Sequence, residues 1–301
     1  PGARGQRRGP PGRPGGPFLH LDPSRVPEVR ALLEKTVREN PEFAELSGAL
    51  RALEELLSKE TTGESLEKHY PAVPDALRGF VELKYDMQHR PSFRLLEALL
   101  YRSRFYKEQC QSVLLTTVNS DARPFAYSTP RLTAGEGGLQ LPLPLRHEGL
   151  TALVAMKEKP APLGETEERL GVTAEQQGAF HQLFTAQVPT PARPFEGPGV
   201  RVRYFGHACI FVESRQVNIL VDPLLSYAYP TEVPRFTFAD LPERIDYLLI
   251  THGHGDHLSL EALLQLRHKV GTIVVPRSSR AIVDPSLRLV LKALGLPRVV
   301  D

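Results

Sequence analysis

Four side chains that could bind metal fall within six residues near the end of the chain. The run Thr251-His252-Gly253-His254-Gly255-Asp256-His257 follows an apolar stretch typical of a buried strand. Imidazole and carboxylate groups are preferred ligands of zinc and iron, and glycines let the backbone turn tightly between ligands. We predict that His252 and His254 hold one metal ion, and that Asp256 and His257 hold a second. Asp256 is also our candidate catalytic residue. The alternative is a surface turn that is rich in histidine.

Closely spaced strands would position this ligand loop. Continuous apolar runs at 219–221 and 248–250 are typical of strands that are buried on both faces, as in a layered α/β sandwich. A helix is expected directly after the loop, at 259–268. The sequence therefore predicts strands at residues 200–205, 208–213, 217–221, 247–251 and 272–275.

Two further motifs precede the loop, Gly206-His207-Ala208 and Ile219-Leu220-Val221-Asp222-Pro223. With the histidine-rich run, these blocks resemble the metallo-β-lactamase fold over the part of the chain after about residue 200. The resemblance implies that Asp222 is a supporting acid at a strand end, which positions the ligand loop through hydrogen bonds. The alternative is a turn aspartate before proline. His207 lies by the same resemblance near the mouth of the site, or it is a hydrogen-bonded histidine at a strand end.

The first part of the chain predicts an α+β domain over residues 21–187. Apolar residues at helical spacing predict amphipathic helices with their apolar stripes in a core. A further helix is expected around 93–106, followed by strands at 112–118 and 125–129 that form a hairpin or small sheet. The proline-rich stretch 188–199 is typical of a linker, and residues 200–301 form the second domain. The helical stripes comprise Val29, Leu32, Leu33, Thr36 and Val37, then Phe43, Leu46, Leu50, Leu53 and Leu57.

Composition excludes several classes of protein. The chain has 301 residues, of which 41% are hydrophobic and 24% charged, and a net charge of +2, which gives no basic footprint for nucleic-acid binding. No apolar run approaches the roughly 20 residues of a membrane helix. Two cysteines, Cys110 and Cys209, form no disulfide framework, and we expect a cytoplasmic protein. Residues 1–20, rich in Gly, Pro and Arg, are expected to be a disordered tail.

The amino-terminal part carries a second resemblance. Residues 77–105, Gln111-Ser112-Val113, and the segments 123–125 and 128–132 resemble the amino-terminal domain of the diiron β-hydroxylase family of chloramphenicol biosynthesis. This resemblance covers the chain from about residue 41 onward. It implies two iron ions, with O2 as co-substrate, that hydroxylate the β-carbon of an aminoacyl group. The aminoacyl group is tethered to the carrier domain of a nonribosomal peptide synthetase. The implied partners are that carrier domain, an electron donor and a second copy of the chain in a homodimer; no nucleic acid or membrane is implied.

Two other functions compete with the hydroxylase. Ligands without thiolate suit zinc as well as iron, so a dizinc hydrolase of an ester, lactone or phosphodiester is the alternative. A metal-free scaffold is a third interpretation, which the intact ligand run opposes. Four arginines could meet an acidic carrier domain, although a solvated helix face is the simpler interpretation. They are Arg90, Arg94, Arg102 and Arg104.

The ends of the chain predict a fragment. The sequence begins at Pro1 and stops at Asp301, shortly after a strand-like run. By the resemblance, the remaining metal ligands follow Asp301, and a glutamate among them distinguishes the hydroxylases from the hydrolases. We therefore expect a truncated αββα metallo-β-lactamase-fold sandwich that has little activity alone.

Overall fold

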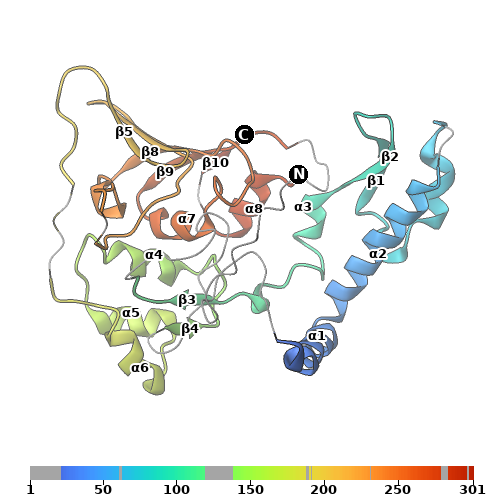
Figure 1. The fold of residues 1–301 in the computed structure, drawn as a ribbon, viewed down its shortest axis with the longest axis horizontal. Coiled ribbons are helices and arrows are strands. Elements are labelled where there is room, and N and C mark those ends of the chain that lie inside the picture. Colours follow the sequence, from blue (N-terminus) through green and yellow to red (C-terminus); the bar gives the residue numbers. More distant parts are fainter. Residues whose placement is uncertain are drawn as a thin grey trace, which may run out of the picture.

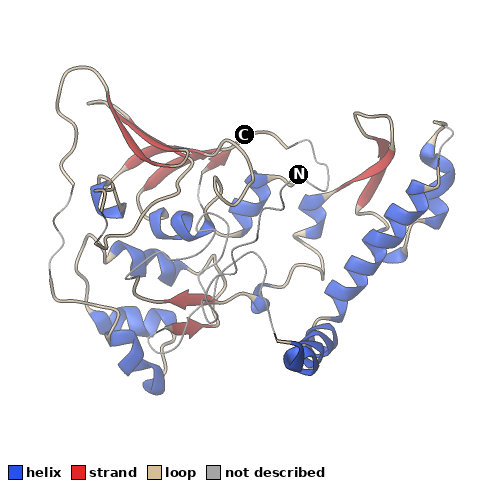
Figure 2. Ribbon diagram, in the orientation of Figure 1, coloured by secondary structure: helices blue, strands red, loops and turns tan. Residues whose placement is uncertain are grey.

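The computed structural model describes residues 22–60, 63–118, 138–187, 190, 192–230, 232–278, 284–296 and 298–301. A sheet and its helices form one end of the molecule, and a long helix with a β-hairpin forms the other (Figures 1 and 2). The expected order, an α+β part followed by a part with a mixed sheet and helices, is confirmed. The expected tail (1–20) and strand (125–129) lie outside the described residues.

A six-stranded mixed sheet forms the second half of the structure. The spatial order is β10-β9-β8-β7-β6-β5, in which β7 to β10 run parallel, whereas β5, β6 and β7 pair antiparallel. All five expected strands are confirmed to within two residues. These five are β5 (Arg201–Gly206), β6 (Cys209–Glu213), β7 (Asn218–Val221), β8 (Ile245–Leu249) and β9 (Val270–Val274), and the sixth strand is β10 (Val299–Val300).

Helices cover one face of this sheet. Helix α7 (Leu260–Leu266), with Ser259 as its N-cap, confirms the expected helix after the ligand loop, and α8 (Leu287–Ala293) lies beside it (Figure 1). Their leucines pack against Phe211, Leu220 and Leu248, which are completely buried. These contacts form the main hydrophobic core.

The opposite face of the sheet is only partly covered. Along the two apolar runs expected to be buried on both faces, Leu220, Leu248 and Ile250 are buried, whereas Ile219, Val221 and Leu249 are half-buried. Strand register places Val202 and Tyr204 of β5 on this face together with Tyr247 of β8. Their exposed fractions are 65%, 63% and 44%. Within the described residues, no layer of side chains is packed over them to the extent seen on the helical face.

The amino-terminal part begins with two helices and a β-hairpin. Helix α2 (Pro41–Ser58) packs its buried leucines against β1 (Val81–Tyr85) and β2 (Pro91–Leu95). The expected helix over 93–106 is wrong, because Phe93 is 2% exposed in strand β2 and pairs with Leu83. Alternation along β2 places Phe93 inward and Arg94 outward, and only the four residues of α3 (Glu97–Leu100) are helical there.

The amino-terminal part contains a second hydrophobic core, separate from that of α2, β1 and β2. Strand β3 (Val113–Leu115), within the expected strand 112–118, pairs antiparallel with β4 (Leu139–Leu141). Leu141, Leu170 and Phe180 are almost completely buried between this pair and three short helices. The helices, which the sequence did not predict, are α4 (Glu148–Ala155), α5 (Leu163–Leu170) and α6 (Ala174–His181).

Helix α1 (Val26–Glu39) departs from its expected packing. Its periodic apolar residues face solvent: Leu32 is 62% exposed, Leu33 61% and Val37 55%. The helix is amphipathic as predicted, but its apolar stripe joins none of the three cores. This stripe is an uncovered apolar surface about three turns long.

Specific polar contacts join the two halves. The buried Arg267 guanidinium donates to the carbonyl oxygen of Leu145 in the first half (2.7 Å) and to that of Gly295 in its own half (3.3 Å). The Glu97 carboxylate accepts from the backbone N–H of Ser286, at the start of α8. Helix α4 packs on α7 (Figure 1). The described residues of the predicted linker 188–199 lie in neither helix nor strand, and no described helix is long and apolar enough to cross a bilayer.

Candidate metal centre

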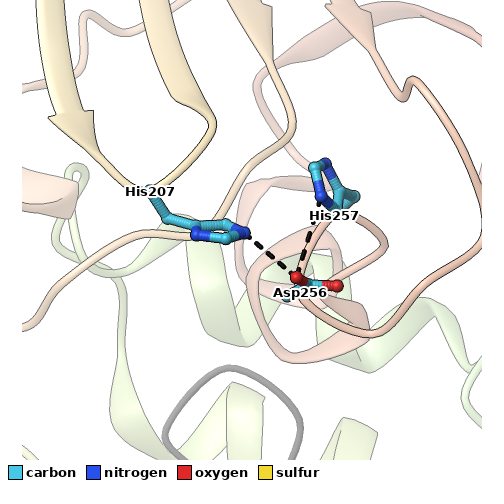
Figure 3. Close-up of side chains that lie close together, drawn as sticks. All are labelled: His207, Asp256 and His257. Atoms are coloured by element: carbon cyan, nitrogen blue, oxygen red, sulfur yellow. Dashed lines mark hydrogen bonds and ion pairs between the residues drawn. The ribbon is translucent and has the colours of Figure 1, made fainter.

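The predicted ligands gather at one edge of the six-stranded sheet. The loop 252–257 follows β8, and Asp222 follows β7, its parallel neighbour. His207 lies in the turn between β5 and β6, which register places at the same edge. Carboxyl ends of parallel strands meet at a common edge, and loops there form sites in open α/β sheets. The structure thus brings together all six predicted site residues (Figure 3 shows His207, Asp256 and His257).

Asp222 anchors the loop from beneath. Its side chain is 2% exposed, and its backbone has a φ of 44°, in the left-handed region that few residues other than glycine adopt. One carboxylate oxygen accepts from the backbone N–H of Thr251 at 2.8 Å. The other lies 2.8 Å from both the Thr251 hydroxyl and His257 Nδ1. Asp222 therefore has the contacts expected of the supporting acid.

His252 and His254 form a first pair of donors. His252 Nε2 lies 3.0 Å from His254 Nδ1. Two nitrogens that bind one tetrahedral zinc ion at about 2.05 Å are separated by roughly 3.3 Å, so this spacing suits ligands of one ion. The His252 ring also lies 4.0 Å, centroid to centroid, from the ring of His257, which links this pair to the next group.

Asp256, His257 and His207 form a second group. Asp256 Oδ2 lies 3.0 Å from His207 Nε2 and 3.7 Å from His257 Nε2, and the three donor atoms fall within 4.8 Å of one another. Figure 3 shows the His207 ring pointing from its turn toward the carboxylate. Partial burial opposes ionisation of Asp256, but a backbone hydrogen bond and the charges of His257 and His207 outweigh it, so its pKa lies below 3.8.

The donor set near the site contains nitrogen and oxygen atoms but no thiolate. Cys209 is adjacent to the turn of His207, but it is fully buried, and burial raises the pKa of its thiol to about 12. A protonated thiol is a poor metal ligand. Imidazole and carboxylate donors fit iron or zinc in a dinuclear arrangement.

Thr251 belongs to the site, although its residue type did not suggest it. Its hydroxyl contacts Asp222, His252 and His257. The available signal was its position between the apolar strand and the first ligand.

The arginines considered for contact with a carrier domain do not form one helix face. Arg90, Arg94 and Arg104 form ion pairs with acids close to them, and they do not share one helix.

Comparison with known proteins connects this geometry to a family. The sequence profile of the "Diiron non-heme beta-hydroxylase N-terminal domain" matches residues 10–188, more than half of the chain. The chain belongs to the diiron non-heme β-hydroxylase family. The profile of the metallo-β-lactamase superfamily matches residues 202–299 of this diiron β-hydroxylase family member.

Relatives of the diiron β-hydroxylase chain include an enzyme from Streptomyces venezuelae. This 4-amino-L-phenylalanyl-[CmlP-peptidyl-carrier-protein] 3-hydroxylase is 39% identical over 95% of the chain, which covers 55% of the relative. The crystal structure of CmlA, a diiron β-hydroxylase from the same organism, superposes with a TM-score of 0.76 at 39% identity, over 92% of this chain and 52% of that one. The chain thus spans about half the length of these proteins.

A shorter similarity links part of the chain to hydrolases. A metal-dependent hydrolase of Alkaliphilus metalliredigens is 35% identical over 75 residues, which is 25% of this chain and 30% of the relative. This similarity is confined to a fraction of the chain, whereas the hydroxylase match runs through both halves.

Proposed function

We propose that the chain belongs to an oxygen-dependent diiron monooxygenase that hydroxylates the β-carbon of a carrier-bound aminoacyl group. The observation that supports this most is the 39% identity to a carrier-protein-dependent 3-hydroxylase over 95% of the chain. The arrangement of two donor groups at one sheet edge supports a dinuclear site independently.

Each ligand has a stated role in this proposal. His252 and His254 would hold one iron ion, and Asp256 and His257 the second. The irons would supply the activation of O2. Asp222 fixes the His257 ring through Nδ1, which leaves Nε2 directed toward Asp256. His207 contacts the same carboxylate oxygen and restricts the rotation of Asp256, our candidate catalytic residue.

The reaction requires an electron donor. When one atom of O2 enters a C–H bond, the other leaves as water, and this balance takes two electrons and two protons from outside the substrate. We therefore include a reductant among the partners. The described residues contain no pair of neighbouring thiols that could supply these electrons, since Cys110 is exposed and Cys209 is buried.

Two further partners follow from the relative and from the surface. The Streptomyces enzyme acts on an aminoacyl group on a peptidyl-carrier protein, and we propose a carrier domain of a nonribosomal peptide synthetase as the partner here. The exposed apolar stripe of α1 supports a homodimer, because apolar patches of this kind mark protein interfaces. We place the enzyme in the cytoplasm, where its two free cysteines are stable.

A dizinc hydrolase remains the second candidate. Its support is the short similarity to metal-dependent hydrolases and a donor set that also suits zinc. It leaves the match of the amino-terminal part unexplained.

Reconstitution of the full-length protein with ferrous iron tests the proposal. With a reductant, O2 and an aminoacylated carrier domain, we expect O2 uptake and a mass gain of one oxygen atom on the aminoacyl group. Labelled O2 should supply that atom. A His252→Ala/His254→Ala variant should lose iron and activity, whereas His181→Ala, an exposed histidine on α6, should retain both. Full occupancy by zinc without O2 uptake would overturn the proposal.

A further inference from the structure

The Thr251 hydroxyl lies at the centre of the ligand loop. Its Oγ1 is 2.8 Å from Asp222 Oδ2, 3.0 Å from His252 Nδ1 and 3.3 Å from His257 Nδ1. We propose that Thr251 is a positioning residue that fixes the tautomer of His252, and with it the direction of the first metal-binding nitrogen. This inference rests on the proposed metal-binding role of the loop, but not on the reaction.

Counting protons assigns the direction of each hydrogen bond. The carboxylate of Asp222 can only accept, so the single Thr251 hydroxyl proton lies on the bond to Asp222. The hydroxyl oxygen then has only lone pairs to offer His252 Nδ1. That contact is a hydrogen bond only if Nδ1 of His252 carries the proton.

A proton on Nδ1 leaves Nε2 of a neutral imidazole with a lone pair. His252 Nε2 is the atom that lies 3.0 Å from His254 Nδ1, on the side where the first ion is expected. The other tautomer would place an N–H in this position and block binding. One hydroxyl, oriented by one buried carboxylate, thereby prepares His252 as a ligand.

His257 shows the same device in a direct form. Its Nδ1 lies 2.8 Å from Asp222 Oδ2, and as the donor it leaves Nε2 free toward Asp256. A single oxygen of Asp222 thus orients histidines from both donor groups, one directly and one through Thr251. Thr251 is doubly held, because its backbone N–H donates to the other oxygen of Asp222.

Ring contacts alone do not select a tautomer. The half-buried His252 ring contacts the rings of His254 and His257, with centroids 4.5 Å and 4.0 Å away. Such contacts restrict where the ring lies, whereas a hydrogen bond at Nδ1 decides which nitrogen carries the proton. A serine in place of Thr251 keeps the hydroxyl, whereas a valine keeps the shape and removes it.

The variants Thr251→Val and Thr251→Ser test the inference, with Thr272→Val in neighbouring strand β9 as the control for loss of a hydroxyl. Nitrogen-15 NMR of labelled histidines reports the tautomer in the metal-free protein. We expect the Nδ1–H form of His252 in the wild type, in Thr251→Ser and in the control, and a mixture of tautomers in Thr251→Val. Zn²⁺ affinity, measured by competition with a chromophoric chelator, should fall about 10- to 100-fold in Thr251→Val alone.

Two outcomes would overturn it: an Nε2–H tautomer in the wild type, or a Thr251→Val variant with the wild-type tautomer and a Zn²⁺ affinity within about twofold of the wild type. Neither measurement depends on turnover. The two proposals fail in different ways. A wild-type protein with the expected His252 tautomer but no O2 uptake would count against the proposed function. An active wild-type oxygenase whose Thr251→Val variant keeps the same tautomer would count against the role of Thr251.

Discussion

Asp222 combines deep burial with a backbone conformation that is unfavourable for most residues. Replacing it with alanine removes the acceptor for the Thr251 N–H and the Thr251 hydroxyl while it keeps the left-handed φ of 44°. We expect Asp222→Ala to lower the free energy of unfolding by about 2–3 kcal/mol, because buried donors lose their partner. Denaturant unfolding of the metal-free protein measures this loss.

Asp222→Asn separates the two causes. Asparagine adopts the left-handed region readily and can still accept one hydrogen bond. Asp222→Asn should therefore lose clearly less unfolding free energy than Asp222→Ala. Asp75→Ala, at a side chain that is 88% exposed, should stay within about 0.5 kcal/mol. An Asp222→Ala variant as stable as the wild type would show that the carboxylate does not support the loop.

At the residue scale, the sequence revealed ligand types but not their contacts. The spacing in His252–His257 points to four candidate donors because few other patterns place imidazole and carboxylate so densely. The sequence allows two interpretations of His207, and only the turn geometry places it 3.0 Å from Asp256. The role of Thr251 depends on Asp222, which is distant in sequence, so no local pattern could predict it.

Helix α1 shows how one element can follow its sequence pattern and still lack a core. If its apolar stripe is a homodimer interface, Leu33→Glu should shift the protein from dimer to monomer in sedimentation experiments. Leu33 is 61% exposed in the single chain, so the variant should keep its unfolding free energy as a monomer to within about 0.5 kcal/mol. Lys35→Glu, a charge change on the same helix, should leave the dimer intact. A Leu33→Glu dimer as tight as the wild type would exclude α1 from the interface.

The turn between α7 and β9 carries a pH-sensitive group. The His268 side chain is only 10% exposed, and neither ring nitrogen makes a well-formed hydrogen bond to the described residues, although Nε2 lies 3.2 Å from Glu158. Burial lowers the pKa of His268 below 6.5, Glu158 opposes this shift and Lys269 adds to it. The folded protein thus binds a proton here less readily than the unfolded chain does.

Stability should therefore fall as pH drops below the unfolded value of about 6.5. The contribution of His268 is present above that pH, and its slope is at most about 1.4 kcal/mol per pH unit. His268→Gln should remove this contribution, so that the unfolding free energy changes less steeply with pH between about pH 7.5 and pH 5.5. His181→Gln, at a side chain that is 53% exposed, is the control. Parallel curves for His268→Gln and the wild type would contradict this account.

Elements whose apolar spacing suits only one kind of secondary structure were predictable, and elements whose spacing suits both a helix and a strand were not. Strands β5 to β9 follow apolar runs that are too short for helices, and all were found. The segment from Phe93 to Tyr101 carries apolar residues at spacings that suit a helix, but pairing with β1 makes its first residues part of strand β2, and only Glu97–Leu100 are helical. Helices α4 to α6 are each eight residues long, and their packing on β3 and β4 stabilises them more than their own sequence pattern.

Polar contacts join the two halves of the molecule, and Arg267 makes one of them with the carbonyl oxygen of Leu145. Arg267 is 7% exposed, and burial lowers the pKa of its guanidinium. Arg267→Met keeps the aliphatic length but removes the hydrogen bonds to Leu145 and Gly295. We expect a loss of about 2–3 kcal/mol and a broader thermal transition, because the halves then unfold less cooperatively. Scanning calorimetry measures both effects. Arg169→Met, on the exposed side of α5, should change neither, and a sharp, unshifted transition in Arg267→Met would refute the coupling.

Arg267 joins the half that contains the ligand-bearing sheet to the first half. Metal binding at the sheet edge should therefore also stabilise the first half against unfolding. An ion that binds only the folded loop reduces the concentration of unfolded chains by mass action, and chains that unfold as one unit share that protection. The rate at which a protease cuts within α5, a helix of the first half that carries none of the proposed ligands, would then slow as metal is added. Proteolysis of the amino-terminal part becomes a measure of occupancy at the metal centre.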